Sequence, residues 1–157
     1  MTRRSPALVR LSHAVSYLRT HGNISAQDLA NAAGISRNTL FLIERKQGNA
    51  KLSTVDRLAT SLDVAPRQLF EVRPSLDDKY TRGLPLQATV ARNIAYSRSR
   101  RAMTMRQLEQ AAELPVGYAS LIERTSPDLK IEMVERVANA LDEKVSALLD
   151  VNFFEET

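Results

Sequence analysis

The sequence contains no cysteine, which excludes disulfide bonds, thiol nucleophiles and thiolate metal sites. It contains only two histidines, His13 and His21, and these do not stand in the HExxH spacing of a zinc site. From these absences we expect no metal site and no catalytic residue of the cysteine or histidine type. We also expect no cofactor.

Long apolar segments are also missing. No uninterrupted apolar run approaches the roughly 18 residues of a membrane span. The first residues, MTRRSPALVR, lack the apolar block of a signal peptide. Hydrophobic residues nevertheless make up 43% of the chain, which is enough to bury a core. We therefore expect a soluble, globular, cytoplasmic protein that does not contact a membrane.

Net positive charge is concentrated in the first part of the chain, because acidic residues are fewer there. Residues 1–74 hold 11 Lys+Arg and 5 Asp+Glu, whereas residues 75–157 hold 11 and 13, which gives net charges of +6 and −2. Attraction to phosphate is the sequence-independent part of nucleic-acid affinity. The first part is therefore the better candidate for contact with DNA.

The sequence repeats itself. A shift of 79 residues aligns positions 11–72 with positions 90–151 without a gap, and 17 of the 62 pairs are identical. The longest identical run is Leu-Ile-Glu-Arg, at 42–45 and again at 121–124. Two copies of one small domain explain this pattern.

The copies predict two domains and a linker. We expect domains at residues 1–72 and 86–157, joined by a linker at 73–85. The linker contains Pro74 and Gly83, which are typical of turns and spacers.

Apolar residues recur at helical spacing in each copy, and no strand pattern appears. Serine before each of the first three helices and glycine after the second are typical capping residues. The helices expected in the first copy are Ser5 to Gly22, Ser25 to Gly34, Ser36 to about Arg45, about 52 to 61, and a short one from Pro66. The predicted fold is all-α, with two tandem five-helix domains.

The segment SAQDLANAAGISRNTLFLIERKQG at residues 25–48 resembles the helix-turn-helix of the λ repressor/Cro-type (XRE) family, and the likeness extends to both copies. In that family one helix lies across the DNA backbone while the next, the recognition helix, enters the major groove. The resemblance therefore implies a double-stranded DNA partner for a bacterial or phage-type, nucleoid-associated regulator.

The resemblance also implies roles for individual residues of the first copy. Base reading falls on Arg37, Asn38 and Leu42, with Ala26 at the start of the preceding helix. Arginine can donate two hydrogen bonds to guanine, and asparagine can pair both ways with adenine. Leu42 is as well explained by a partner contact or by the core. The expected backbone contacts are Ser25, Thr39, Arg45, Lys46 and Lys51.

A second class of residues is structural. The family pairs an arginine of its first helix with a glutamate that ends the recognition helix, and both copies keep the pair. We expect ion pairs between Arg19 and Glu44 and between Arg98 and Glu123.

The second copy departs from the pattern where bases would be read. Glu113 replaces the turn glycine and Pro115 replaces the capping serine, and the base-facing positions become Val116, Gly117 and Leu121. None of these last three side chains can hydrogen-bond a base edge. The remaining basic cluster could touch phosphates or an acidic partner, or could be a solvated face: Arg92, Arg100, Arg101 and Arg106.

Phe153 and Phe154 follow the last repeated helix and have no counterpart in the core pattern. They either cap their own domain or pack against another protomer, and we expect the second as a dimer contact.

Three functional hypotheses follow. The first is a sequence-specific transcriptional regulator, a repressor, whose first domain reads operator DNA while the second forms a homodimer or binds a protein. This first hypothesis implies no enzyme. The second is a protein-binding antagonist or adaptor, antirepressor-like or antitoxin-like, that uses Phe41, Leu42 and Leu121. The third lets both copies sit on one DNA face as a covalent pseudo-dimer. The +6 charge of the first part favours DNA binding.

Overall fold

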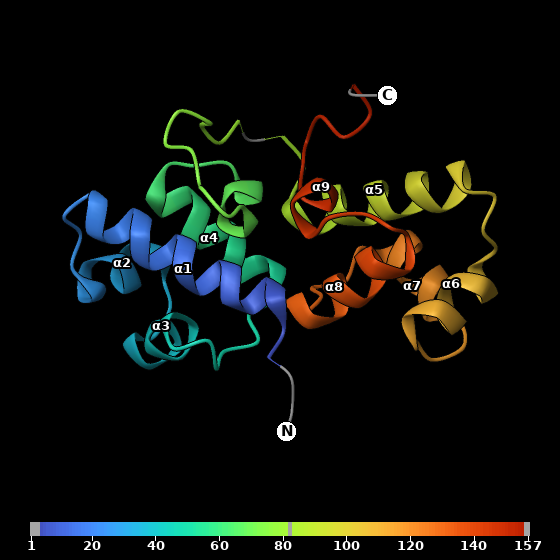
Figure 1. Cartoon of the computed structure of the whole chain (residues 1–157), viewed down its shortest axis with the longest axis horizontal. Coiled ribbons are helices and arrows are strands. Elements are labelled where there is room, and N and C mark those ends of the chain that lie inside the picture. Colours follow the sequence, from blue (N-terminus) through green and yellow to red (C-terminus); the bar gives the residue numbers. More distant parts are fainter. Residues whose placement is uncertain (1–3, 82, 156–157) are drawn as a thin grey trace.

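The computed structural model describes residues 4–81 and 83–155, so the outermost residues of both expected domains and one linker residue lie outside it. These parts of the chain are helical and contain no β-strand, as predicted; the only extended pairing among them is one isolated bridge. The first five helices in order are α1 (Pro6–His21), α2 (Ala26–Ala33), α3 (Arg37–Glu44), α4 (Leu52–Leu62) and the 3-10 helix η1 (Pro66–Phe70). They are followed by α5 (Leu86–Arg100), α6 (Met105–Ala112), α7 (Tyr118–Thr125), α8 (Ile131–Ala140) and α9 (Val145–Leu148) (Figure 1).

The helices form two groups, which we call the N-terminal half (α1 to η1) and the C-terminal half (α5 to α9) (Figure 1). With the shift of 79 residues, α6 starts and ends at the positions of α2, and α8 starts at the position of α4. The largest departure is α7, which starts two positions later than α3 does. The cause is local to the turn before α7 and is described with the site.

One hydrophobic core runs through both halves. Buried apolar side chains of the first and second groups belong to a single packed cluster. Leu52 and Ile131, the first residues of α4 and α8, are fully buried where the two groups meet. Removing this apolar surface from water stabilises the two halves against each other.

The loops before α4 and α8 pair with each other. The backbone N–H of Leu52 donates to the carbonyl of Leu129, and that of Ile131 donates to the carbonyl of Ala50, both at 2.9 Å. These two bonds make an antiparallel bridge between Lys51 and Lys130. Each loop thus pairs its backbone with its counterpart in the other half.

Each of these loops also caps a helix of the opposite half. Neither α4 nor α8 has a side-chain cap from its own N-cap lysine. Instead the Asp128 carboxylate accepts from the Ser53 N–H at 2.9 Å, and the side-chain amide oxygen of Asn49 accepts from the Glu132 N–H at 3.1 Å. The first backbone N–H groups of a helix have no intrahelical acceptor. Because the acceptors here come from the opposite half, these caps tie the two halves together.

A second polar contact joins the halves beside η1. Arg67 donates to Asp78 of the linker at 2.7 Å and to Asp150, after α9, at 2.8 Å, while Gln68 also donates to Asp78 at 2.7 Å. Burial alone would raise the pKa of Asp78, but the hydrogen bonds from Arg67 and Gln68 lower that pKa below its ordinary value of 3.8. Asp78 is therefore held ionised at this junction.

No helix in the described part of the chain is both long and apolar enough to cross a lipid bilayer.

Candidate nucleic-acid interface

The turn between α2 and α3 forms as the sequence predicts. Gly34 ends α2 in the left-handed region, with φ 64° and ψ 33°, which glycine adopts without a side-chain clash. Two residues later Ser36 caps α3, its hydroxyl accepting from the Thr39 N–H at 2.9 Å. Ser25 caps α2 in the same way, accepting from the Asp28 N–H at 3.0 Å. These caps set where α3 begins relative to α2.

α3 buries one face and exposes the other. Leu40 and Ile43 lie in the core. Arg37 and Asn38 occupy the first turn of α3 and are both exposed. Their hydrogen-bonding groups are therefore open to a ligand at the helix start, where a recognition helix meets base edges.

The two apolar positions assigned to this surface differ from each other. Ala26, at the start of α2, is partly buried against the core. Leu42 is half-buried and does not hydrogen-bond through its side chain. Of the four positions expected to face bases, Arg37 and Asn38 therefore carry all the side-chain hydrogen-bonding capacity.

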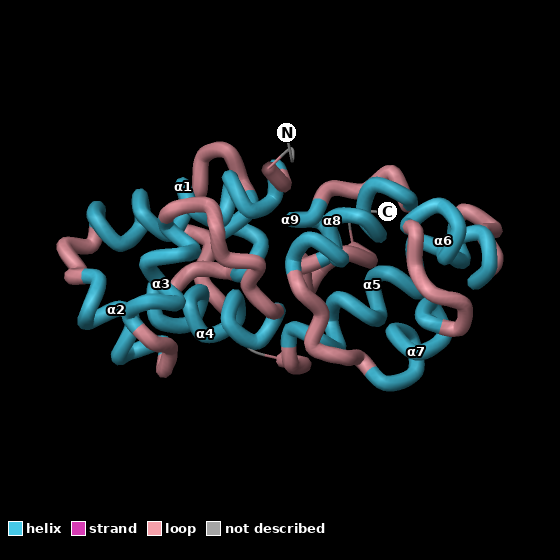
Figure 2. Tube along the Cα trace, turned by 90° about the horizontal axis from the view of Figure 1, so that it is seen from below, coloured by secondary structure: helices cyan, strands magenta, loops and turns pink. Residues whose placement is uncertain are grey.

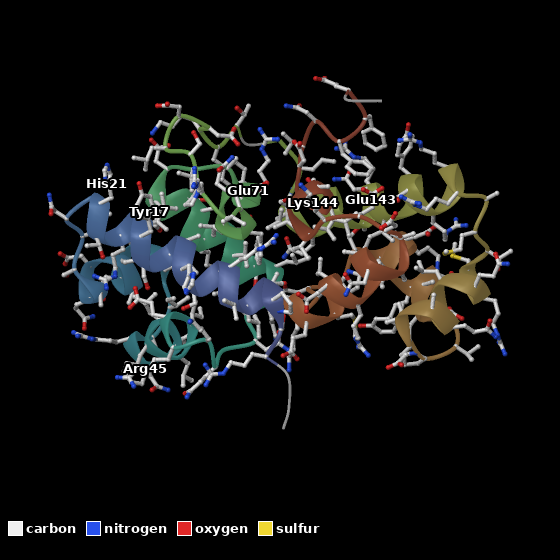
Figure 3. The ribbon with its side chains drawn as sticks, viewed as in Figure 1. Tyr17, His21, Arg45, Glu71, Glu143 and Lys144 are labelled. Carbon is white, nitrogen blue, oxygen red and sulfur yellow. The ribbon has the colours of Figure 1, made fainter. Side chains whose placement is uncertain are left out.

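The five residues expected at the DNA backbone lie along α2, α3 and the loop to α4. Ser25 and Lys51 are exposed, and Lys46 is half-buried with φ 63°. The Thr39 hydroxyl lies 2.7 Å from that of Ser36. The Arg45 guanidinium, at the lower left of Figure 3, stacks 4.6 Å above the ring of Phe41.

Both predicted structural ion pairs form. Arg19 Nε donates to Glu44 at 2.7 Å, and Arg98 Nε donates to Glu123 at 2.6 Å. The hydrogen bond to Glu123 raises the pKa of Arg98 above its ordinary value. Each arginine also donates to a backbone carbonyl before the next helix, that of Ile24 or Met103. Each pair therefore ties the first helix of its half to the third, α1 to α3 and α5 to α7.

The C-terminal half keeps the turn but rebuilds the start of the following helix. Glu113 takes the left-handed conformation of Gly34, with φ 55°. The next helix, α7, begins only at Tyr118, after Gly117 at φ 86°. Val116, 75% exposed, and Gly117 therefore precede the helix, which corrects the expectation that they occupy its base-facing positions.

Glu109 takes part in this rebuilt start and was missed by the sequence analysis. It occupies the position of Ala30 in the repeat and is buried, with 5% of its surface exposed. Its carboxylate accepts from the Ala119 N–H at 3.1 Å, next to the N-terminus of α7. The buried glutamate replaces the capping serine that Pro115 removes; an acidic residue at a core position was the available signal.

Asp128 and Asn49 were also missed by the sequence analysis, which assigned neither of them a role. Both side chains cap helices of the opposite half. Asn49 and Asp128 stand at equivalent positions of the repeat, each two residues before a lysine that offers no side-chain cap to the helix after it. This pattern was a signal for the role.

The arginine cluster of the C-terminal half is only partly open. Arg92 donates to the Val151 carbonyl and stacks 4.6 Å above the Phe154 ring. Arg101 lies 3.4 Å from the Asp142 carbonyl and 3.5 Å from Glu143. Arg100 and Arg106 are exposed.

Phe153 and Phe154 pack on their own half. Their rings lie edge-on to Tyr96 of α5, with centroids 5.9 and 4.5 Å away, and both side chains are half-buried. The structure thus shows the first of the two alternatives, capping, and a contact with another protomer remains a prediction.

Comparison with known proteins supports the assignment of the first half. The family model described as helix-turn-helix matches residues 15–69, which include α2, the turn at Gly34 and α3. Comparison with curated proteins and with solved structures gives no match. Residues 15–69 therefore match the helix-turn-helix family model, in agreement with their resemblance to the λ repressor/Cro-type (XRE) family.

Proposed function

We propose that this protein is a sequence-specific transcriptional repressor that reads operator DNA with the first turn of α3. The observation that carries the proposal is the exposure of Arg37 and Asn38 directly after a capped helix-turn-helix turn. The match of residues 15–69 to a DNA-binding family supports it, as does the positive charge of the first part of the chain.

The two side chains suit different bases. Arg37 can donate two hydrogen bonds to the O6 and N7 atoms of guanine, and Asn38 can both donate to and accept from adenine. Each such pair discriminates against a wrong base by about 1 to 3 kcal/mol. Around them, Ser25, Lys46 and Lys51 would bind phosphates and fix the register without reading sequence.

We further propose that the two halves are tandem helix-turn-helix domains with different tasks. The turn before α7 holds Val116 and Gly117 at the repeat positions where α3 carries arginine and asparagine, so the second domain would read no bases. The second domain would instead help to position the first domain on DNA. We place the protein in the cytoplasm, where its occupancy of the operator would repress transcription.

A protein-binding role for the whole chain, as an antagonist or adaptor, is the second candidate function. Val116 keeps 75% of its surface exposed in the turn before α7, and Phe41 keeps 48% on α3. Exposed apolar side chains favour contact with another protein. This role predicts a partner but no preferred DNA sequence.

Selection from random double-stranded DNA, followed by footprinting of the enriched site at stated salt, separates the two candidates. A DNA reader enriches one motif and protects it well above random DNA. Failure to enrich any motif, with equal affinity for all sequences, would contradict base reading and favour the protein-binding role.

A further inference from the structure

The contact between the halves has the form of a two-fold symmetric dimer interface. A shift of 79 residues converts the bond from Leu52 N–H to the Leu129 carbonyl into the bond from Ile131 N–H to the Ala50 carbonyl. In a symmetric dimer, residue i of one subunit contacts j of the other and j contacts i. Here this exchange takes place within one chain.

The helix caps and helix packing follow the same exchange. The shift converts the contact of Asp128 with the Ser53 N–H into that of Asn49 with the Glu132 N–H. It also converts the packing of α1 on α8 into the packing of α5 on α4, and both are present. The chain is therefore an intramolecular pseudo-dimer, and its pseudo-two-fold axis passes between Lys51 and Lys130.

Two basic residues are paired at this axis. Lys51 and Lys130 are paired through their backbones, and both side chains are exposed. No ion pair links either lysine to an acidic residue in the described ranges 4–81 and 83–155. Like charges directly opposite each other across a bridge are unfavourable, so an anionic partner would relieve this repulsion.

The positions of α3 and α7, the helices that precede these loops, favour DNA as the anionic partner. α3 and α7 lie on either side of the junction (Figure 2). In both views α3 lies below α1 and α7 lies below α5, so both are displaced toward the same side of the molecule (Figures 1 and 2). A dimer of helix-turn-helix units binds half-sites about 34 to 36 Å apart along one face of DNA, with the protein axis over the centre of the site.

We propose that a single chain binds double-stranded DNA with its pseudo-two-fold axis over the duplex, so that Lys51 and Lys130 both contact phosphates. The N-terminal half reads one half-site. The C-terminal half contacts the neighbouring DNA segment only at its phosphates. The operator is then asymmetric, with one specified half-site. This inference rests on the proposed DNA binding and replaces the homodimer expected from the sequence.

The test compares three single substitutions in the full-length protein: Lys51→Gln, Lys130→Gln and the control Lys144→Gln. Lys144 is exposed beside α9 and lies well above Arg45 in Figure 3. Each lost phosphate contact lowers the magnitude of the slope of log affinity against log salt by about 0.9. Thermal unfolding of each variant checks that it is folded.

We expect the substitutions at Lys51 and Lys130 to lower the salt slope equally, the one at Lys144 to leave it unchanged, and sedimentation to show one chain per site. An effect at Lys51 without one at Lys130, or two chains per site, would overturn the pseudo-dimer while leaving operator reading intact. No DNA binding by the wild-type protein would instead refute the proposed function, and this inference with it.

Discussion

The Asp128 carboxylate accepts hydrogen bonds from both the N–H and the hydroxyl of Ser53, at 2.9 and 2.5 Å, across 75 residues of sequence. Asp128 thereby caps α4, which receives no side-chain cap from its own N-cap residue, Lys51. Replacing a capping residue by alanine costs about 0.5 to 2 kcal/mol. We expect Asp128→Ala to lower the free energy of unfolding by about 1 kcal/mol in urea denaturation.

Asp77→Ala is the matched control, because Asp77 is an exposed linker aspartate. It should leave the free energy of unfolding within about 0.5 kcal/mol of wild type. Equal stability of the two variants would remove Asp128 from the contacts that hold the halves together.

Acid should weaken the junction at Asp78. Because its pKa in the folded protein lies below the ordinary value of 3.8, this carboxylate stabilises the fold above that pH. Its contribution is lost as the pH falls through the lower, folded pKa. Denaturation from pH 7 to pH 2 should show a steeper loss of stability below about pH 4 for wild type than for Asp78→Asn. If the Asp78→Asn profile runs parallel to the wild-type profile, the Arg67 contact does not stabilise the junction.

The second structural ion pair supports the C-terminal half. The side chains of Arg98 and Glu123 are only 16% and 13% exposed, so removal of one leaves the other charged and poorly solvated. We expect Arg98→Met to lower the free energy of unfolding by about 3 kcal/mol, and Arg98→Met with Glu123→Leu to recover part of that loss. Calorimetric unfolding measures both. A double variant less stable than the single would contradict the stranded-charge explanation.

The sequence predicts the elements whose signals are local. Ser5, Ser25 and Ser36 cap the first three helices where expected, and Gly34 takes the left-handed turn. Both ion pairs could be anticipated because the resemblance to the family implies them and both repeats keep the residues. These features depend on residues within a few positions or on a repeated pattern.

The sequence does not predict features that depend on contacts between distant segments. The late start of α7 depends on Gly117 together with a buried Glu109 ten residues away from its hydrogen-bonding partner, Ala119. The roles of Asn49 and Asp128 exist only once the two loops meet. Spacing along the chain does not show that the two loops lie side by side. From the sequence, the pseudo-dimer was therefore only one of three functional hypotheses.

Lys46 separates phosphate binding from base reading. Its expected contact is with a phosphate, which carries no sequence information, so Lys46→Ala should weaken binding to specific and random DNA alike. The salt slope should fall by about one unit. Titrations at several salt concentrations measure it, and a wild-type slope would show that Lys46 does not touch DNA.

The most direct test measures Arg37→Ala and Asn38→Ala on the selected operator and on variants of it with each base pair changed. The control is Arg73→Ala, since exposed Arg73 lines a hollow with Tyr17. Tyr17 lies well above Arg45 in Figure 3. We predict that the first two substitutions each cost about 1 to 3 kcal/mol on the operator, little on random DNA, and relax preference at one base pair, while Arg73→Ala does none of these. Equal losses on operator and random DNA, with base preference unchanged, would contradict the reading of DNA by α3.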